Sequence, residues 1–487
     1  MNIFKSFGIY AGGQAVNAGI RFLLIPYYSY LLSVSDFGKV GMVWMFVPIL
    51  TMLIGMGATA SVALKYYKIK NELRENLLNF AFAATFVLFL CIGTVVFFSH
   101  PVLEQMFLLD VSRTDYMKLV CAAYGAFLIE FILGWFKIRI EPHRFVLFNT
   151  LYTLISIGFL LFFLAVLGRG FLGFIDGTMY GNLVTALILA FVYISSCKSF
   201  RIRLPSGVIA DLFRLSMPIV VGFVVSYIMT YSGRYVLAQV STLEDVGIYT
   251  MGTRLGDAFN VFFIVPFLTA INPILFKLFA EDGNGFVYSM KRYFDVYLLS
   301  GAFLLLFANA VLGIVFRFLV HEQYIESSLI AQIAFWGMFI FGLSQLVGTV
   351  NLVRERIRLV TLFSICGGII NLSLTYLLVP IMGVVGAISA SLVSYIILLE
   401  LQYFSSQSII YIDYEIRKAM FFTGGVLVTF FLQLMVDQHV SVWWVAAGVK
   451  ILVLVLFICL SYYFRIYEDM NLVIAKIKER FDLKSFV

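Results

Sequence analysis

Long apolar runs dominate this sequence of 487 residues. A helix that crosses a membrane needs about 20 consecutive, mostly apolar residues, and fourteen segments of the chain meet that requirement, mostly with short connections between them. The predicted segments are residues 8–32, 40–61, 77–99, 117–138, 145–168, 172–195, 215–240, 247–270, 293–316, 328–352, 359–380, 383–404, 419–437 and 441–464.

The composition leads to the same conclusion. Hydrophobic residues make up 62% of the chain and charged residues 13%, whereas soluble domains average roughly 45–50% and 25%. No water-soluble core hides so much apolar surface, so the bilayer must be the solvent for most of it. We therefore expect an all-α polytopic membrane protein with about fourteen transmembrane helices.

Positive charge gives the orientation. With the N-terminus in the cytoplasm, 25 of the 34 Lys and Arg residues fall on the cytoplasmic side and only five in the opposite loops, as the positive-inside rule requires. The expected location is the bacterial inner membrane, with both termini cytoplasmic. The net charge of +7 is spread over these loops, which indicates contact with anionic lipid head groups and no nucleic-acid binding.

A short motif suggests an internal repeat. Ser35-Asp36-Phe37-Gly38 follows the first predicted helix, and Glu244-Asp245-Val246-Gly247 follows the seventh, 209 residues later. An even number of helices in each half gives two repeats of the same topology, related by an axis along the membrane normal. The expected units are an N-terminal six-helix lobe (1–197), a cytoplasmic linker (198–214), a C-terminal six-helix lobe (215–404), helices thirteen and fourteen (417–465) and a cytoplasmic amphipathic tail (466–487).

The sequence lacks the motifs of soluble catalysis. It has no Walker A loop, HExxH, GxSxG or dinucleotide fingerprint, and its four His and five Cys residues have no metal-ligand spacing. We expect no enzyme activity, no metal site and no cofactor. Any energy for transport would come from a Na⁺ or H⁺ gradient, or from consumption of the product.

Two arginines inside predicted helices are candidates for a substrate site. A charge at the bilayer centre costs about 2.5–3.5 kcal/mol, so it faces the protein interior or a water-filled cavity. Arg21, with Asn17 nearby, and Arg234 each lie in the opening helix of a half, and each helix is weakened by a proline, Pro26 or Pro218. Weakened helices in both halves indicate a substrate site, and a guanidinium grips phosphate or diphosphate in two-point geometry.

Other intramembrane charges leave two interpretations open. Arg254 and Asp257 share a helix face at i and i+3, so they form either a structural ion pair or part of the substrate site. Glu130 is either hydrogen-bonded structure or, like Asp257, a site for ion or proton coupling. Glu400 and Lys450 are expected to snorkel to an interface.

Two stretches carry a family resemblance. Asn17–Gly41 (NAGIRFLLIPYYSYLLSVSDFGKVG) and, more strongly, Leu215–Asp257 resemble the Wzx-type O-antigen and exopolysaccharide flippases of the multidrug/oligosaccharidyl-lipid/polysaccharide exporter superfamily. The family pattern has a Leu-Pro entry, an Arg in the helix, an acidic-x-Gly-x-Tyr turn and then a basic residue. The matching positions are Pro218, Arg234, Gly247, Tyr249 and Arg254. One position departs: the family often has an acidic residue where this chain has Gly233.

This resemblance implies two six-helix lobes in a V, around a central cavity that opens alternately to each side. It implies transport of an undecaprenyl-diphosphate-linked oligosaccharide from the cytoplasmic to the outer leaflet. The diphosphate would meet the cavity arginines, and the sugars would occupy the hydrated cavity, where Tyr or Trp rings stack on them. Membrane lipids, glycosyltransferases and a polysaccharide polymerase are the implied partners.

Two alternatives remain at this stage. An ion-coupled multidrug or metabolite antiporter of the same superfamily would favour acidic rather than basic cavity residues. A membrane polysaccharide polymerase or ligase would carry a large polar outer loop, whereas the predicted outer loops here are short.

Overall fold

The computed structural model describes residues 3–197, 201–281, 283–439 and 443–463. In these ranges the secondary structure is helical, and no strand is present. The chain is therefore all-α, as predicted. The predicted amphipathic tail, residues 466–487, lies outside the described residues.

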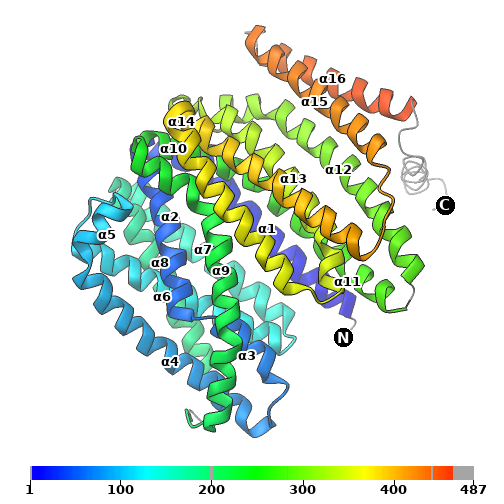
Figure 1. The fold of residues 1–487 in the computed structure, drawn as a ribbon. Helices are drawn as coiled ribbons and strands as arrows, with labels where there is room; N and C mark the ends of the chain where they lie inside the picture. The colour runs from blue at the N-terminus through cyan, green and yellow to red at the C-terminus, as the bar shows by residue number, and fades with distance from the viewer. Residues whose placement is uncertain (1–2, 198–200, 282, 440–442, 464–487) are drawn as a thin grey trace, which may run out of the picture.

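The first half of the chain forms one lobe, drawn from blue through cyan to blue-green in Figure 1. Helix α6 is buried along most of its length and packs against α8, α4 and α2, so it forms the core of this lobe. The helices of the lobe are α1 (Ile3–Leu31), α2 (Val34–Gly55), α3 (Ala58–Tyr66), α4 (Asn71–Phe98), α5 (His100–Phe107), α6 (Arg113–Ile138), α7 (Pro142–Leu161), η1 (Phe162–Val166) and α8 (Gly170–Ser196).

The second half forms a second lobe, in which α13 packs along α14 and α10. Its first helix also links the lobes, because α9 packs against α14 at one side and against α3 at the other. The helices are α9 (Ser206–Val240), α10 (Leu243–Phe259), η2 (Asn260–Ile264), α11 (Val265–Glu281), α12 (Gly283–Phe318), η3 (Glu322–Tyr324), α13 (Ser327–Val353), α14 (Ile357–Ile409), α15 (Ile416–His439) and α16 (Trp443–Tyr463).

Within the described residues, each of the fourteen predicted segments falls on helix, but some boundaries differ from the prediction. Eleven of the described helices are long and apolar enough to span a membrane. One of them, α14, contains two predicted segments, 359–380 and 383–404, joined at Gly383, where φ is 57° and ψ is −132°. Helices α1 and α16 hold two further segments. Segment 40–61 is interrupted, since α2 ends at Gly55 and the chain turns through Met56 and Gly57 with positive φ.

The repeated motif is where the two lobes meet. A Cβ atom on Gly38 would lie 1.9 Å from the Leu243 carbonyl oxygen, and one on Gly247 would lie 2.1 Å from the Val34 carbonyl oxygen. The two contacts are equivalent under the 209-residue offset, because Gly38 corresponds to Gly247 and Val34 corresponds to Leu243. Two backbones approach this closely only where side chains are missing, so glycine lets α2 and α10 cross in direct contact.

The same offset relates the starts of α2 and α10. Ser33 caps α2 by accepting from the Asp36 N–H, and Thr242 caps α10 by accepting from the Asp245 N–H. Both helices therefore begin at equivalent positions, with an acidic residue in the first turn, where the helix dipole favours it. The two predicted motifs thus make matching contacts and begin their helices in the same way.

A second contact closes the same end of the molecule. The Gln323 side chain donates to the carbonyl oxygens of Ser29 and Leu32, at 3.1 Å each. The Tyr324 hydroxyl donates to the carbonyls of Leu32 and Ser33, at 3.2 and 3.1 Å. The connection from α12 to α13 thus satisfies carbonyls at the end of α1 and in the turn that follows it, and it ties the second lobe to the first.

The last two described helices, α15 and α16, lie as a pair beside α12 at the edge of the second lobe (Figure 1). Asn309 of α12 donates to the Gln433 side chain of α15 at 2.8 Å, and Gln433 donates to the Lys450 carbonyl of α16 at 3.3 Å. Lys450 is only 1% exposed. Its predicted snorkelling was wrong, because the side chain is enclosed where this helix pair docks.

The glycine contact gives a first testable prediction. We expect Gly38→Ala or Gly247→Ala to separate α2 from α10 and shift the protein away from this closed arrangement, since overpacking costs about 1–3 kcal/mol. Thr250→Cys in a background without native cysteines is the reporter, because Thr250 is fully buried at this crossing. Labelling by an impermeant maleimide should rise in both variants. Gly158→Ala, with open space around its Cβ position, is the control, and equal labelling in all three would contradict the assignment.

Candidate functional site

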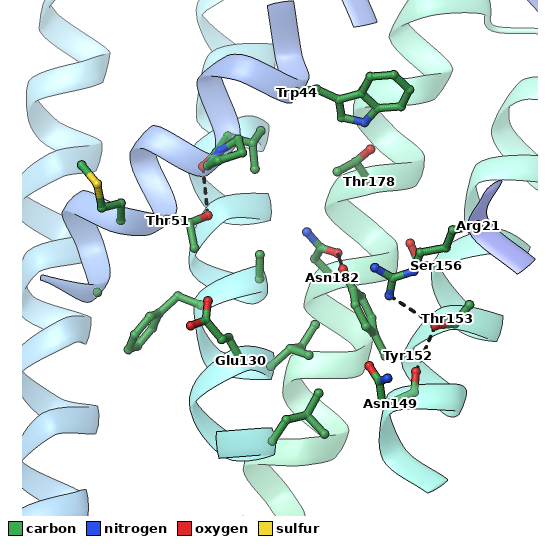
Figure 2. A pocket seen from close by; sticks show the side chains of 18 of the residues that line it. Arg21, Trp44, Thr51, Glu130, Asn149, Tyr152, Thr153, Ser156, Thr178 and Asn182 are labelled. Carbon is green, nitrogen blue, oxygen red and sulfur yellow. Dashed lines mark hydrogen bonds between the residues drawn. The ribbon is translucent and has the colours of Figure 1, made fainter. Parts of the chain in front are cut away.

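A cavity of about 1290 Å³ lies between the lobes. Helices α1, α2, α3, α6, α7 and α8 supply one wall, and α9, α10 and η2 supply the other. The cavity extends to Gly57, Ala58 and Lys137, at the end of the molecule opposite the glycine contact. Figure 2 shows the wall formed by the first lobe.

Three cations line this cavity, and each lies over an aromatic ring. Arg254 of α10 lies 4.3 Å from the centre of the Trp44 ring of α2, so this contact joins the lobes. Arg21 lies 4.6 Å from the Tyr152 ring and Lys137 4.7 Å from the Phe145 ring. A cation on a ring gains about 0.5–2 kcal/mol, less than it gains from charge-assisted hydrogen bonds to an anion. The rings therefore hold the cations in place but leave them able to bind an anion.

Arg21 is held by neutral groups. Its Nη2 donates to Thr153 Oγ1 at 3.2 Å, and Thr153 in turn donates to the Asn149 carbonyl at 3.0 Å. The Tyr152 hydroxyl below the guanidinium donates to Asn182 Oδ1 at 3.3 Å. These contacts orient Arg21 toward the cavity without neutralising its charge (Figure 2).

Two carboxylates share the cavity. Asp257 lies one turn from Arg254, with 3.5 Å between Oδ2 and Nη1, as the i, i+3 spacing predicted. Glu130 of α6 also lines the cavity, on the same helix as Lys137. With three cations and two carboxylates, the lining has an excess of positive charge.

Arg234 and Asn17, two of the five predicted substrate residues, lie behind the cavity wall. Arg234 is 3% exposed; its Nη2 donates to Thr253 Oγ1 at 3.1 Å, and its guanidinium lies over the Tyr231 ring at 5.2 Å. Tyr231 is the residue that lines the cavity at this point. Asn17 is also 3% exposed and donates to Thr150 Oγ1 at 3.2 Å.

The packing of Tyr249 explains why position 233, beside Arg234, is glycine in this chain. A Cβ atom on Gly233 would lie 2.5 Å from the Tyr249 hydroxyl oxygen. An acidic side chain does not fit there unless Tyr249 moves. Arg234 consequently has no acidic neighbour at position 233, and it contacts Thr253 of α10 and Tyr231 of its own helix, α9.

Comparison with known proteins is consistent with this architecture. Residues 3–279 match the family model described as "Polysaccharide biosynthesis protein". The chain belongs to this family. A search of curated proteins found no match.

Solved structures show which fold this family member has. A structure described as "Lipid II flippase MurJ, inward closed conformation" matches with a TM-score of 0.72 and 15% identity, over 93% of this chain and 98% of that one. An inward-facing multidrug resistance MATE transporter of the MOP superfamily matches with a TM-score of 0.62 and 15% identity, over 81% and 94%. A MOP superfamily transporter from Pyrococcus furiosus, titled for the reverse polarity of its binding pocket, has a TM-score of 0.53 and 15% identity, over 83% and 95%. The predicted fold, a polytopic all-helical transporter fold, is confirmed.

Within this fold, the sequence missed the cavity residues that carry no charge. Trp44, Tyr152 and the hydroxyl and amide groups of α7 and α8 were not singled out, and neither was Lys137. With 27 Tyr and 51 Phe in the chain, one ring carries no signal. The spacing of Asn149, Thr153 and Ser156 along one face of an otherwise apolar helix is the signal that was available.

The burial of Arg234 gives a second prediction. We expect Arg234→Ala to lower the thermal stability of the purified protein by roughly 2–5 kcal/mol, since it removes a large buried side chain and leaves a void at the junction of α9 and α10. Melting of the detergent-solubilised protein measures this. Arg354→Ala, which removes an exposed arginine stacked on Phe279 at 5.0 Å, should change stability little. Equal melting temperatures for the two variants would show that Arg234 is not part of the packed core.

Proposed function

We propose that this protein flips an undecaprenyl-diphosphate-linked oligosaccharide from the cytoplasmic to the outer leaflet by alternating access. The observation that carries the proposal is the lining of the inter-lobe cavity by Arg21, Lys137 and Arg254, each over an aromatic ring. A diphosphate offers these cations charge-assisted hydrogen bonds, which are stronger than their contacts with the rings. The family membership and the shared transporter fold support the same proposal.

The direction of opening follows from the proposed orientation. With the N-terminus in the cytoplasm, the end that holds the Gly38 and Gly247 contacts faces outward and is closed. The opposite end, where the cavity reaches Gly57 and Lys137, faces the cytoplasm. The diphosphate and sugars enter there, and the lipid tail stays in the bilayer beside the lobes.

Cavity charge separates this proposal from a multidrug-type antiporter. An antiporter for cationic drugs needs a net negative site, whereas here three cations face two carboxylates. Glu130 and Asp257 take a different role in our proposal, as groups that couple transport to an H⁺ or Na⁺ gradient. No other cofactor is part of the proposal. Glycosyltransferases and a polymerase are its proposed partners on the two sides of the membrane.

The decisive experiment follows the lipid-linked glycan in cells that lack this gene. We expect complete repeat units to accumulate on the cytoplasmic side, inaccessible to an added lectin or periplasmic enzyme, and to reach the outer leaflet on re-expression. Repeat units that reach the outer side without being polymerised would identify a polymerase defect. An unchanged glycan pool together with a loss of drug resistance would favour the antiporter.

Variants of the cavity arginines test the binding role. Arg21→Ala and Arg254→Ala should each lower export by tenfold or more at normal protein levels, because one charge-assisted hydrogen bond contributes about 1.5–3 kcal/mol. Arg74→Ala is the matched control, since Arg74 also lies over an aromatic ring, Tyr66, but outside the cavity. Export at the control level in both cavity variants would refute diphosphate binding here.

The carboxylates give a separate prediction. Asp257→Asn should keep binding of the lipid-linked substrate, since Asn keeps the shape of the side chain, but should abolish the response of transport to an imposed pH or Na⁺ gradient. Transport in proteoliposomes with each gradient in turn measures this, and Glu130→Gln is examined in parallel. If both variants respond as the wild type does, neither residue is a coupling group.

A further inference from the structure

We propose that Trp44 and Tyr152 form a sugar-stacking subsite, which the arginines cover while the cavity is empty and uncover when phosphate arrives. This inference rests on the proposed function and specifies where the glycan part of the substrate binds. The ligand class is a saccharide attached directly to a diphosphate.

Both rings are half-buried, line the cavity and carry a guanidinium on one face. Neither guanidinium is tightly held by a carboxylate. Arg254 lies 3.5 Å from Asp257, a loose ion pair, and the hydrogen bond from the Arg21 side chain goes to the neutral hydroxyl of Thr153. A phosphate group that approaches either arginine offers two-point, charge-assisted hydrogen bonds. The guanidinium then moves off the ring, and the apolar face becomes free.

The surroundings of the two rings suit a sugar. A pyranose has an apolar C–H face, which packs on an aromatic ring, and a rim of hydroxyl groups, which need hydrogen-bonding partners. Asn149 and Ser156 line the cavity beside Tyr152, and Thr178 lines it beside Trp44 (Figure 2). The hydrogen bond from the Tyr152 hydroxyl to Asn182 fixes the plane of that ring, and Asn182 is itself fixed by donating to the Ala122 carbonyl at 2.9 Å.

Other aromatic residues at the cavity are less suited. Tyr227 and Tyr231 pack on each other, with 4.6 Å between ring centres, and Tyr231 also supports the buried Arg234. Phe145 is 3% exposed. Phe223 and Phe262 lie on the wall of the second lobe among apolar residues such as Val261. Among these rings, Trp44 and Tyr152 combine partial exposure, a cation on one face and polar neighbours.

The proximity of rings and arginines has a chemical reason. In a diphosphate-linked glycan, the first sugar is joined directly to the phosphate. A sugar whose phosphate holds Arg21 or Arg254 must therefore lie within one ring's length of Tyr152 or Trp44. Phosphate binding and sugar stacking become consecutive steps at one place.

Binding to the full-length protein in nanodiscs tests the inference with two probes. Geranyl diphosphate carries the lipid and diphosphate without sugar. The second probe is the glycan-bearing polyprenyl diphosphate extracted from cells that lack this gene. The variants are Trp44→Leu and Tyr152→Leu, with Trp44→Phe and Tyr152→Phe to restore a ring. Tyr180→Leu is the control, because Tyr180 stacks on Phe163 at 5.4 Å and does not line the cavity.

We expect the two leucine variants to bind geranyl diphosphate at least as tightly as the wild type does, because no ring then competes for the guanidinium, and to bind the glycan-bearing lipid at least tenfold more weakly. The phenylalanine variants should recover most of that loss. Geranyl diphosphate should also change the tryptophan fluorescence of the wild type, and Trp44→Phe should abolish this change, because Arg254 leaves the Trp44 ring when phosphate binds.

Two outcomes would overturn the inference. Equal weakening for both probes would show that the rings only position the arginines, and no weakening for either would show that the sugars bind elsewhere. Failure of the wild type to bind either probe is a different result, because it would refute the proposed function, and the sugar subsite with it.

Discussion

The crossing of α2 and α10 is the contact on which the rest of this structure depends. Gly38 and Gly247 let each helix touch the backbone of the other, and no other residue type permits that distance. This contact fixes how the two lobes meet at one end. The inter-lobe cavity lies beyond it and extends toward Gly57 and Lys137, where α9 also packs against α3.

The charges in the cavity follow a consistent arrangement. In a medium of low polarity, a cation needs a partner, and a carboxylate at short range would bind it too firmly to release it for a ligand. Aromatic rings bind a cation less firmly than a carboxylate does, since they stabilise its charge and leave its N–H groups free to meet a ligand. Arg21, Lys137 and Arg254 all use it. The two carboxylates of the cavity pair loosely or lie apart, which leaves an electrostatic surface suited to an anion.

Much of this fold could be predicted from the sequence, and the reasons are physical. A bilayer demands long apolar helices, so the fourteen segments were visible as runs. The motif around Gly38 and Gly247 was visible because the contact needs glycine. The break of the second segment at Met56 and Gly57 was not predicted, because the residues on both sides are apolar. Nor was the depth of Arg234 or Lys450, since periodicity shows that a charge lies inside a helix bundle but not whether it faces a cavity or a packed junction. Trp44 and Tyr152 could be recognised only after the helices were placed around them.

The contact between Arg254 and Trp44 also bears on how an empty transporter behaves. Because it joins α10 to α2, the two helices that form the closed end, parting the lobes without a ligand would forfeit it. A cation–π contact of about 1–2 kcal/mol changes a two-state population by about 5- to 30-fold. The unloaded protein is thereby biased against changing its access, and a ligand that captures Arg254 removes that bias. Such a bias reduces futile cycling and makes occupancy of the site a condition for the conformational change.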